Sequence, residues 1–394
     1  MNEPEANELV PDLVTQHRFD IGNTVGMKAR EQYANGVLVE DLDDFDNWIS
    51  ATKAAIDEGA EVIFEAAFAT DDVFVAVDVL QKAEDGWKLV EVKSSLSAKD
   101  YHINDLSIQK WVLSQCGINV TSCEVMHLNK ECVYPNLEQL FTTSDVTEEV
   151  NELQPTVEGN VVALCETLDS SIPEIAPGEH CRSPFKCSFY DRCNKAKPLD
   201  HISNLYRVNP DRVRELGEEH DIESIHHITD EIKLTPVQQR QIKSIKTSEL
   251  VLEEGLKNEL SRIKYPIAFL DFETVMPAIP IWEGTKPYNA IPVQFSCHLV
   301  TEDGKVEHFE GLEVGDDDPR LSLAQKLLEA CEPANTIIAY NAPFEKRCIE
   351  VIAGVNPEKK DRLLDLNFKF VDLLPIVRNN LYHPEFNCPE RHLS

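Results

Sequence analysis

Strand-like and helix-like segments occur in two groups in this sequence, separated by residues 200–262, where strand signals vanish. The first group has three strand-like runs whose links carry hairpin turn residues. Its elements are a helix at 46–58, strands at 61–68, 73–80 and 87–93, a helix at 100–116 and a strand at 119–128. We expect Asp100 to cap the second helix and Gly117 to stop it. This order is typical of an α/β unit around a mixed sheet.

The second group begins at residue 266. PIAFLDF is a continuous apolar run and predicts a central strand that is buried on both faces. A long Pro-rich loop, two strands, a helix near 319–332, the strand TIIAYN and a helix at about 343–353 follow. We therefore predict an α/β (α+β) fold in three parts: residues 1–199, a helical connector at 200–262, and residues 263–394.

The length and cysteine content limit the class of protein. At about 100–200 residues per domain, 394 residues predict two or three domains. No apolar run approaches the roughly 20 residues that span a bilayer, and the N-terminal residues lack a secretory signal pattern. Eleven cysteines, an odd number, fit reduced thiols or metal ligands better than a disulfide framework. We expect a cytoplasmic protein without a membrane partner.

The charge is strongly acidic but unevenly spread. With 70 acidic and 37 basic side chains, the net charge of −33 disfavours a protein that coats nucleic acid through general electrostatic attraction. It does not exclude an enzyme that holds phosphates through metal ions and a local basic patch. Residues 181–197 form such a patch, with five basic side chains against Asp191 alone.

The first candidate site lies on the strands at 73–80 and 87–93. Asp78 is on the earlier strand, and Glu91 and Lys93 are two residues apart on the later one, so they face the same side. Two carboxylates and an ammonium suit a metal-dependent phosphodiesterase. Glu65 on the preceding strand and Gln109 on the following helix could complete the rim. Taken alone, the E-x-K pattern is more typical of a solvated strand face, and it is the combination with the strand order and the cysteine trio that favours a site.

The helix at 100–116 brings further polar groups to the same side. His102 and Asp105 share a helical face with Gln109, because they precede it by seven and four residues.

The second candidate site is a cysteine-rich loop. CRSPFKCSFYDRC places Cys181, Cys187 and Cys193 at six-residue intervals, which predicts a thiolate metal site. Iron–sulfur clusters and structural zinc both require four ligands. Cys165 and His180 are candidates for the fourth ligand, and three unlinked thiols are the alternative.

The third candidate site follows the strand at 266. LDFET places Asp271 and Glu273 on one face at a strand end, where paired carboxylates can bridge two Mg²⁺ or Mn²⁺ ions. YNAPFEKR supplies Asn341 and Glu345, and FVDLL supplies Asp372. The alternative is a solvated strand end, but acids buried without partners among apolar residues are costly, which favours a metal site.

Residues 19–193 resemble the RecB-like nucleases of the PD-(D/E)XK superfamily, particularly the CRISPR-associated exonucleases that carry an iron–sulfur cluster. The motifs are FDIGNTVGMKA, IFEAAF, VAVDVL, LVEVKSS, the glutamine of DLSIQKWVL and the cysteine trio. The resemblance implies a restriction-endonuclease-like domain. It makes Asp78, Glu91 and Lys93 the catalytic core, with Asp78 and Glu91 as metal ligands, and Glu65 and Gln109 supporting residues.

The same resemblance implies a cofactor in the cysteine loop. Cys181, Cys187 and Cys193 become three of the four ligands of a 4Fe–4S cluster. Such families carry the remaining cysteine near the N-terminus, whereas the first cysteine here is Cys116.

The C-terminal region resembles the DEDD exonucleases of the ribonuclease H-like fold. Asp271 and Glu273 match the first motif, and Asn341 and Glu345 match the second, with glutamate where aspartate is usual. The resemblance implies metal binding by Asp271, Glu273 and Glu345, with Asp372 as a further candidate ligand. The third motif does not appear before the chain ends at CPERHLS, so we expect a truncated domain.

Together, residues 19–390 resemble an uncharacterised bacterial family that fuses these two kinds of nuclease domain. The resulting hypothesis is a Mg²⁺- or Mn²⁺-dependent nuclease acting on nucleic acid, with DNA favoured over RNA. Exonucleolytic cleavage is one mode of action that the resemblance allows. The alternative is a non-catalytic module that keeps the nuclease folds. A cysteine hydrolase is disfavoured, because no Cys–His arrangement recommends it.

Overall fold

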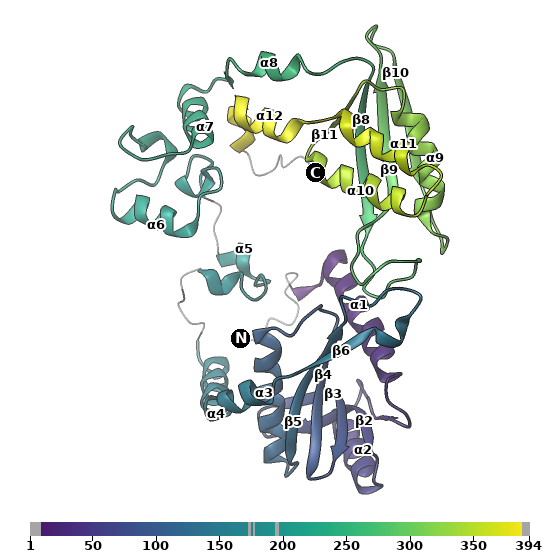
Figure 1. Ribbon diagram of the computed structural model, residues 1–394. Helices are drawn as coiled ribbons and strands as arrows, with labels where there is room; N and C mark the ends of the chain where they lie inside the picture. The colour runs from purple at the N-terminus through teal and green to yellow at the C-terminus, as the bar shows by residue number, and fades with distance from the viewer. Residues whose placement is uncertain (1–8, 172–174, 176–177, 194–196, 388–394) are drawn as a thin grey trace. The chain divides into compact units, whose positions relative to one another are not determined.

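The computed structural model describes residues 9–171, 175, 178–193 and 197–387. The chain divides into two units (Figure 1). Unit 1 comprises residues 1–194 together with 276–289, and unit 2 comprises residues 195–275 and 290–394. Both units combine helices with β-sheet, so the mixed α/β class is confirmed.

Unit 1 contains a six-stranded sheet in the order β1-β2-β3-β4-β5-β6. The β1/β2 and β4/β5 pairs are parallel and the other pairs antiparallel, so the sheet is mixed, as predicted. The strands are β1 (Val37–Leu38), β2 (Val62–Ala69), β3 (Phe74–Ala83), β4 (Gly86–Lys93), β5 (Val120–Leu128) and β6 (Phe141–Asp145).

Helices cover this sheet and bury its apolar residues. They are α1 (Leu13–Arg30), α2 (Phe45–Asp57), α3 (Asp100–Gln115) and α4 (Thr147–Asp169), whereas the short α5 (Tyr190–Cys193) has no buried residue. Leu106 and Leu113 of α3 pack with Leu80 and Leu89 of the sheet, all fully buried. The expected cap of α3 was wrong by one residue, since Lys99 is the N-cap and Asp100 the first helical residue.

Unit 2 contains a five-stranded sheet in the order β10-β9-β8-β11-β12. The strand β9 is antiparallel to β8 and β10, and β11 is parallel to β8 and β12. The strands are β8 (Ile267–Val275), β9 (Ile291–Val300), β10 (Val306–Leu312), β11 (Thr336–Ala339) and β12 (Phe370–Asp372).

The strand β8 lies in the middle of this sheet but is not buried on both faces. Ala268, Leu270 and Phe272 join a core with three helices, α9 (Pro319–Cys331), α10 (Ala342–Gly354) and α11 (Lys360–Leu366). Phe269, by contrast, is 41% exposed. The prediction of two buried faces was therefore wrong, because a short apolar run reads the same whether one face or both are covered.

The connector forms several short helices and a small apolar core of its own. Ile202, Leu216 and Ile225 are fully or almost fully buried within it. Its helices are α6 (Pro210–Glu218), α7 (Pro236–Thr247) and α8 (Leu256–Leu260). A two-residue strand, β7 (Val251–Leu252), pairs with β13 (Leu381–Tyr382), which follows α12 (Leu373–Asn380). The prediction that residues 200–262 contain no strand was wrong, because a strand of two residues is too short to show the alternation by which strands are recognised in a sequence.

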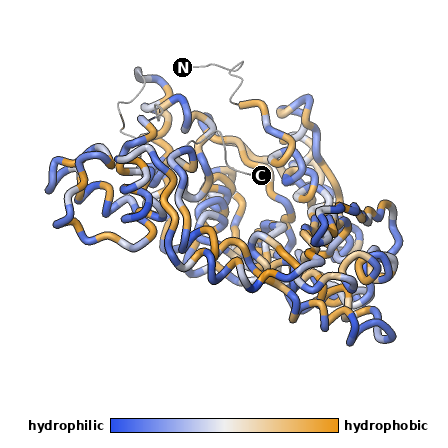
Figure 2. Tube along the Cα trace, turned by 90° about the horizontal axis from the view of Figure 1, so that it is seen from above, coloured by the Kyte–Doolittle hydropathy of each residue, from blue (hydrophilic) through white to orange (hydrophobic). Residues whose placement is uncertain are grey.

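Polar and apolar residues alternate along most of the chain, as Figure 2 shows. Across the described residues, no helix is both long and apolar enough to cross a membrane.

The core of unit 2 makes a stability prediction possible. Leu327 of α9 is fully buried, whereas Leu321 of the same helix is 54% exposed. Leu327→Ala should lower the free energy of unfolding by about 2–5 kcal/mol, because it leaves a cavity. Leu321→Ala should change it by less than about 0.5 kcal/mol. Hydrogen exchange of peptides from β8 to α11 measures both effects, and equal losses would contradict this packing.

Candidate active sites

The register of β3 and β4 brings the first two acids together. The antiparallel ladder ends at the Val79–Val90 pair, and Asp78 and Glu91 are the residues next to this pair on the two strands. Asp78 Oδ2 accepts the backbone N–H of Val92 at 2.6 Å. Glu91 is only 5% exposed. The two carboxylates predicted from strand spacing therefore share one end of the β3–β4 ladder.

Lys93 and the helix α3 complete the group around Glu91. Lys93 Nζ forms ion pairs with Glu91 Oε1 and, at 3.2 Å, with Asp105 Oδ2. Gln109 Nε2 donates to Glu91 Oε2 at 2.8 Å. Each oxygen of Glu91 thus has its own donor. The helical spacing that placed Asp105 and Gln109 on one face is confirmed, because both reach the same cluster.

Burial dominates the electrostatics of this group. The pKa of Asp78 is raised to about 7, mainly by burial and also by the charges of Glu65 and Asp105, against the opposing effects of the Val92 N–H and Lys93. Burial, followed by the nearby charge of Asp78, holds the pKa of Glu91 well above its usual range. Burial lowers the pKa of Lys93, but the carboxylates around its ammonium outweigh this effect and raise it.

Glu65 lies beside the group in an unusual backbone conformation. Its φ of +56° is in the left-handed region, within the strand β2. Trp48 Nε1 donates to the Glu65 carbonyl at 2.6 Å, and Arg30 Nη2 pairs with Glu65 Oε1 at 2.6 Å. Burial raises the pKa of Glu65, although Arg30 opposes this. A non-glycine residue in this region is held by its surroundings, and such residues cluster at functional sites.

The donor set of this group fits a divalent cation. The amide oxygen Oε1 of Gln109 is buried and has no hydrogen-bond partner among the described residues. Mg²⁺ is commonly held by one or two carboxylates together with water and substrate phosphates. Two crowded carboxylates with raised pKa values and an unpaired amide oxygen are such oxygen donors. A nearby cation would also favour their ionised forms.

The cysteine loop does not bring its thiols together. Cys181 is half-buried, whereas Cys187 and Cys193 are exposed, and all three are free. In the described part of the chain, one group of three or more His, Cys, Asp or Glu side chains has its ligand atoms within 4.8 Å of one another. That group is Glu215, Glu219 and His220, two of them exposed, so neither the cysteines nor the acids of the predicted sites form one.

The loop does contact the helix that carries Asp105 and Gln109. The Phe185 ring, 64% exposed, meets Tyr101 of α3 edge-on with centroids 4.9 Å apart. The guanidinium of Arg182 lies over the Tyr190 ring at 4.8 Å. Aromatic and basic side chains of the predicted patch are therefore found together beside α3.

In unit 2 the acids of the C-terminal site differ in burial. Asp271 and Glu273 are exposed, whereas Glu345, in the first turn of α10, is 4% exposed. Burial and the charge of Asp271 raise the pKa of Glu345 to about 8, although the Phe272 N–H bonded to it lowers it. Glu345 Oε2 is buried without a hydrogen-bond partner among the described residues.

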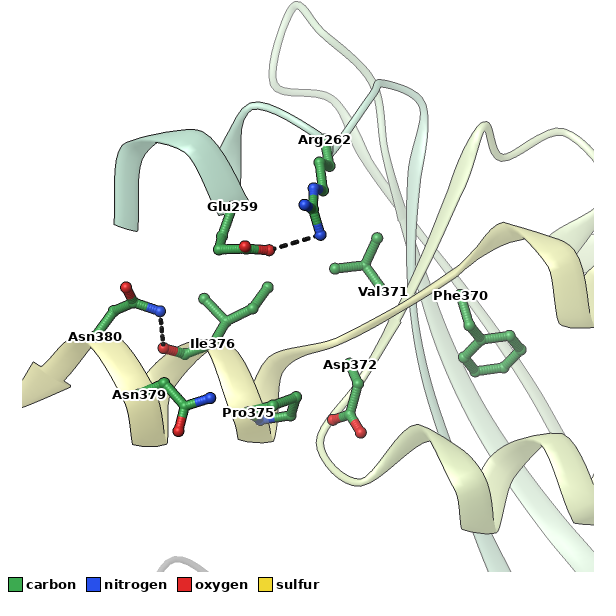
Figure 3. A pocket seen from close by; sticks show the side chains of 9 residues that line it. All are labelled: Glu259, Arg262, Phe370, Val371, Asp372, Pro375, Ile376, Asn379 and Asn380. Carbon is green, nitrogen blue, oxygen red and sulfur yellow. Dashed lines mark hydrogen bonds and ion pairs between the residues drawn. The ribbon is translucent and has the colours of Figure 1, made fainter. Parts of the chain in front are cut away.

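Asp372 has a structural position. Its Oδ1 accepts the N–H of Leu374 at 3.0 Å, as the cap of α12, and the N–H of Asn341 at 3.1 Å. It borders a pocket of about 610 Å³ that also contains the Glu259–Arg262 ion pair. Figure 3 shows the Asp372 carboxylate pointing away from that pair. Asp372 Oδ1, an oxygen that a metal ion would need, is therefore already occupied by two hydrogen bonds.

Sequence reasoning missed Arg30, which pairs with Glu65. It follows the quoted motif FDIGNTVGMKA directly, so proximity to a motif residue was the available signal. The pairing itself spans 35 residues, and no local pattern indicates it.

Comparison with known proteins supplies one family match. A family model described as a domain of unknown function (DUF2779) matches residues 268–389. No curated protein and no solved structure matches the chain. The matched region contains Asp271, Glu273, Glu345 and Asp372.

The raised pKa of Asp78 predicts a pH-dependent stability. Between its ordinary value of 3.8 and about 7, the folded protein holds a proton that the unfolded chain releases. The contribution of Asp78 to stability therefore falls as the pH rises through this range, and is level above it. Asp78→Asn removes the contribution. The Tm of the variant minus that of wild type, measured in EDTA, should rise from pH 5 to 7 and then stay constant.

The control for this experiment is Asp85→Asn, in the exposed turn between β3 and β4. Its Tm difference from wild type should not vary with pH. A difference for Asp78→Asn that is equally flat from pH 5 to 8 would contradict the burial of this carboxyl group.

Proposed function

We propose that this chain is a metal-dependent nuclease whose principal hydrolytic site is the group around Asp78, Glu91 and Lys93. The observation that carries the proposal is the convergence of two carboxylates, an ammonium and the Gln109 amide at the end of one β-ladder. A structural salt bridge needs one acid and one base. This group instead crowds two acids whose pKa values burial raises, which is typical of a functional site.

The order of the secondary-structure elements supports this proposal. The order of three strands, helix, strand and helix predicted for the C-terminal part is realised as β8, β9, β10, α9, β11 and α10. We propose that residues 263–394 have the ribonuclease H-like fold. The mixed sheet of unit 1 is consistent with a restriction-endonuclease-like core.

The residues of unit 1 divide the chemical work. Asp78 and Glu91 would hold Mg²⁺ or Mn²⁺, which when bound polarises a phosphate and makes water a better nucleophile at neutral pH. Lys93, paired with Glu91 and Asp105, carries a positive charge that can orient an attacking water and stabilise negative charge on phosphoryl oxygens. Gln109 fixes the orientation of Glu91 through its Oε2 contact.

We propose that the C-terminal acids form a second, exonuclease-type site of lesser activity. Asp271 and Glu273 are exposed on β8, and the raised pKa of Glu345 reflects their closeness. Asp372 is assigned a capping role in this proposal and not a ligand role, because its Oδ1 already accepts two N–H groups. For the cysteine loop we propose the 4Fe–4S cluster that the resemblance implies, with zinc as the alternative that the cysteine spacing allows.

One observation favours the alternative of a non-catalytic module. No three acids of either site have all their ligand atoms within 4.8 Å among the described residues. A chain that had lost catalysis but kept the fold could still bind nucleic acid through its basic loop.

A nuclease assay separates these functions. End-labelled single- and double-stranded DNA and RNA are incubated with Mn²⁺ or Mg²⁺ and wild type, Lys93→Ala or Asp271→Ala. Loss of one charge-stabilising group at an active site typically lowers kcat by roughly 10²- to 10³-fold. We expect this loss for Lys93→Ala and a change below about tenfold for Asp271→Ala.

The control is Lys88→Ala, also on β4 but paired with Glu124. Loss of hydrolysis in Asp271→Ala alone would indicate that the principal active site lies in unit 2. A wild-type protein that cuts no substrate with either metal would leave the non-catalytic module as the function.

The basic loop predicts a salt-dependent affinity. Arg182 and Lys186 belong to the cationic patch, and each phosphate contact contributes about −0.7 to −0.9 to the slope of log K against log salt. Arg182→Ala or Lys186→Ala should reduce the magnitude of this slope by up to about 1 in fluorescence anisotropy with labelled DNA. Lys53→Ala, on the exposed side of α2, should leave it unchanged. Affinity that does not depend on salt would exclude this role.

A further inference from the structure

The segment Met276–Asn289 is part of unit 1, although it lies between the strands β8 and β9 in the sequence. Its main chain bonds to the loop after β5. Tyr134 N–H donates to the Thr285 carbonyl at 3.0 Å, and Gly284 N–H donates to the Tyr134 carbonyl at 3.1 Å. Lys286 forms an ion pair with Glu131 of the same loop at 2.8 Å. The segment is therefore fixed to unit 1 by its backbone.

Apolar contacts place the segment beside the end of β4. Ala278, 7% exposed, packs in a cluster with Val25 of α1 and Leu128 of β5. Tyr288 and Val92 pack against the same cluster. Because Val92 directly precedes Lys93, the segment reaches the strand that carries the proposed catalytic ammonium.

Tyr288 makes the direct contact. Its hydroxyl donates to the carbonyl of Ser94 at 2.7 Å, across 194 residues of sequence. Ser94 is the first residue after β4, and Lys93 is the last within it. Leu128 N–H holds the next carbonyl, that of Ser95, at 3.0 Å. The backbone that leaves Lys93 is thus held at two successive carbonyls.

The backbone of Tyr288 is itself constrained. Its φ of +58° lies in the left-handed region, and its N–H donates to the Pro277 carbonyl at 2.8 Å. A tyrosine keeps this conformation only where the surroundings hold it, which points to a specific placement of the side chain.

We propose that Tyr288 is a positioning residue for Lys93. By holding the Ser94 carbonyl, it keeps the end of β4 in the conformation that directs the ammonium toward Glu91 and Asp105. The inference rests on the proposed function for its catalytic consequence, but the positioning itself concerns the folded chain alone. A segment that lies between β8 and β9 in the sequence would thus take part in the site of unit 1.

The experiment uses the full-length chain with Tyr288→Phe, which removes the hydroxyl and keeps the ring. We expect the Tm to stay within about 2 °C of wild type, since one partly buried hydrogen bond is lost. Hydrolysis should show a kcat lowered about three- to tenfold with an unchanged KM, because Lys93 is misplaced while substrate binding is retained. Tyr134→Phe, which removes a hydroxyl nearby and leaves the Ser94 contact intact, is the matched control.

A second measurement does not depend on activity. Acylation of lysines by a water-soluble ester at one fixed pH, followed by peptide mass spectrometry, reports how accessible each amine is. Lys93 should be labelled at least about threefold faster in Tyr288→Phe than in wild type, because its ion pairs are held less firmly. Lys88 of the same strand is the internal reference.

The outcomes separate the two proposals. Equal labelling of Lys93 in both proteins would overturn the positioning role, whether or not the protein is a nuclease. Faster labelling of Lys93 with no hydrolysis by wild type would support the positioning role and contradict the nuclease function.

Discussion

The burial of the Glu91 carboxylate is the constraint on which the site of unit 1 depends. An ionised carboxylate is expensive to remove from water unless charges and donors replace the lost solvation. Here Lys93 and Gln109 each donate to one of its oxygens. Asp78, instead of relieving this cost, adds a second acid nearby and raises it. The arrangement is therefore costly as a stabilising salt bridge, which is the physical ground for proposing a cation and a phosphate as its partners.

The two candidate sites meet the same cost differently. In unit 2, Asp271 and Glu273 remain in solvent, and only Glu345 is buried, with a backbone N–H as its donor. Its raised pKa follows from burial and from the charges of the exposed acids. The unit 1 group includes a lysine whose positive charge can stabilise a phosphate, whereas the donor to the buried acid of unit 2 is a backbone N–H. This contrast is the physical basis for ranking the first site above the second.

Local periodicity explains why much of the unit 1 site could be predicted from the sequence. Strand alternation placed Glu91 and Lys93 on one face, hairpin order placed Asp78 on the adjacent strand, and helical spacing aligned Asp105 with Gln109. These relations span a few residues or one tight turn. Arg30 and Tyr288 could not be found in this way, because their contacts join distant parts of the chain. The exposed face of β8 was missed for another reason, since an apolar run does not say which face has a partner.

The place of Tyr288 changes what counts as the unit 1 site. The Pro-rich stretch after β8 reads as a connecting loop, and its composition fits that description. Its backbone nevertheless bonds to the loop after β5, and its side chains share an apolar cluster with α1 and Val92. A fragment ending at residue 199 would contain Asp78, Lys93, Asp105 and Gln109, the four groups around Glu91. It would lack the Tyr288 hydroxyl, which bonds to the backbone after Lys93. The site is therefore a property of the chain as a whole, because the geometry of its lysine depends on residues that the sequence places in the other half of the protein.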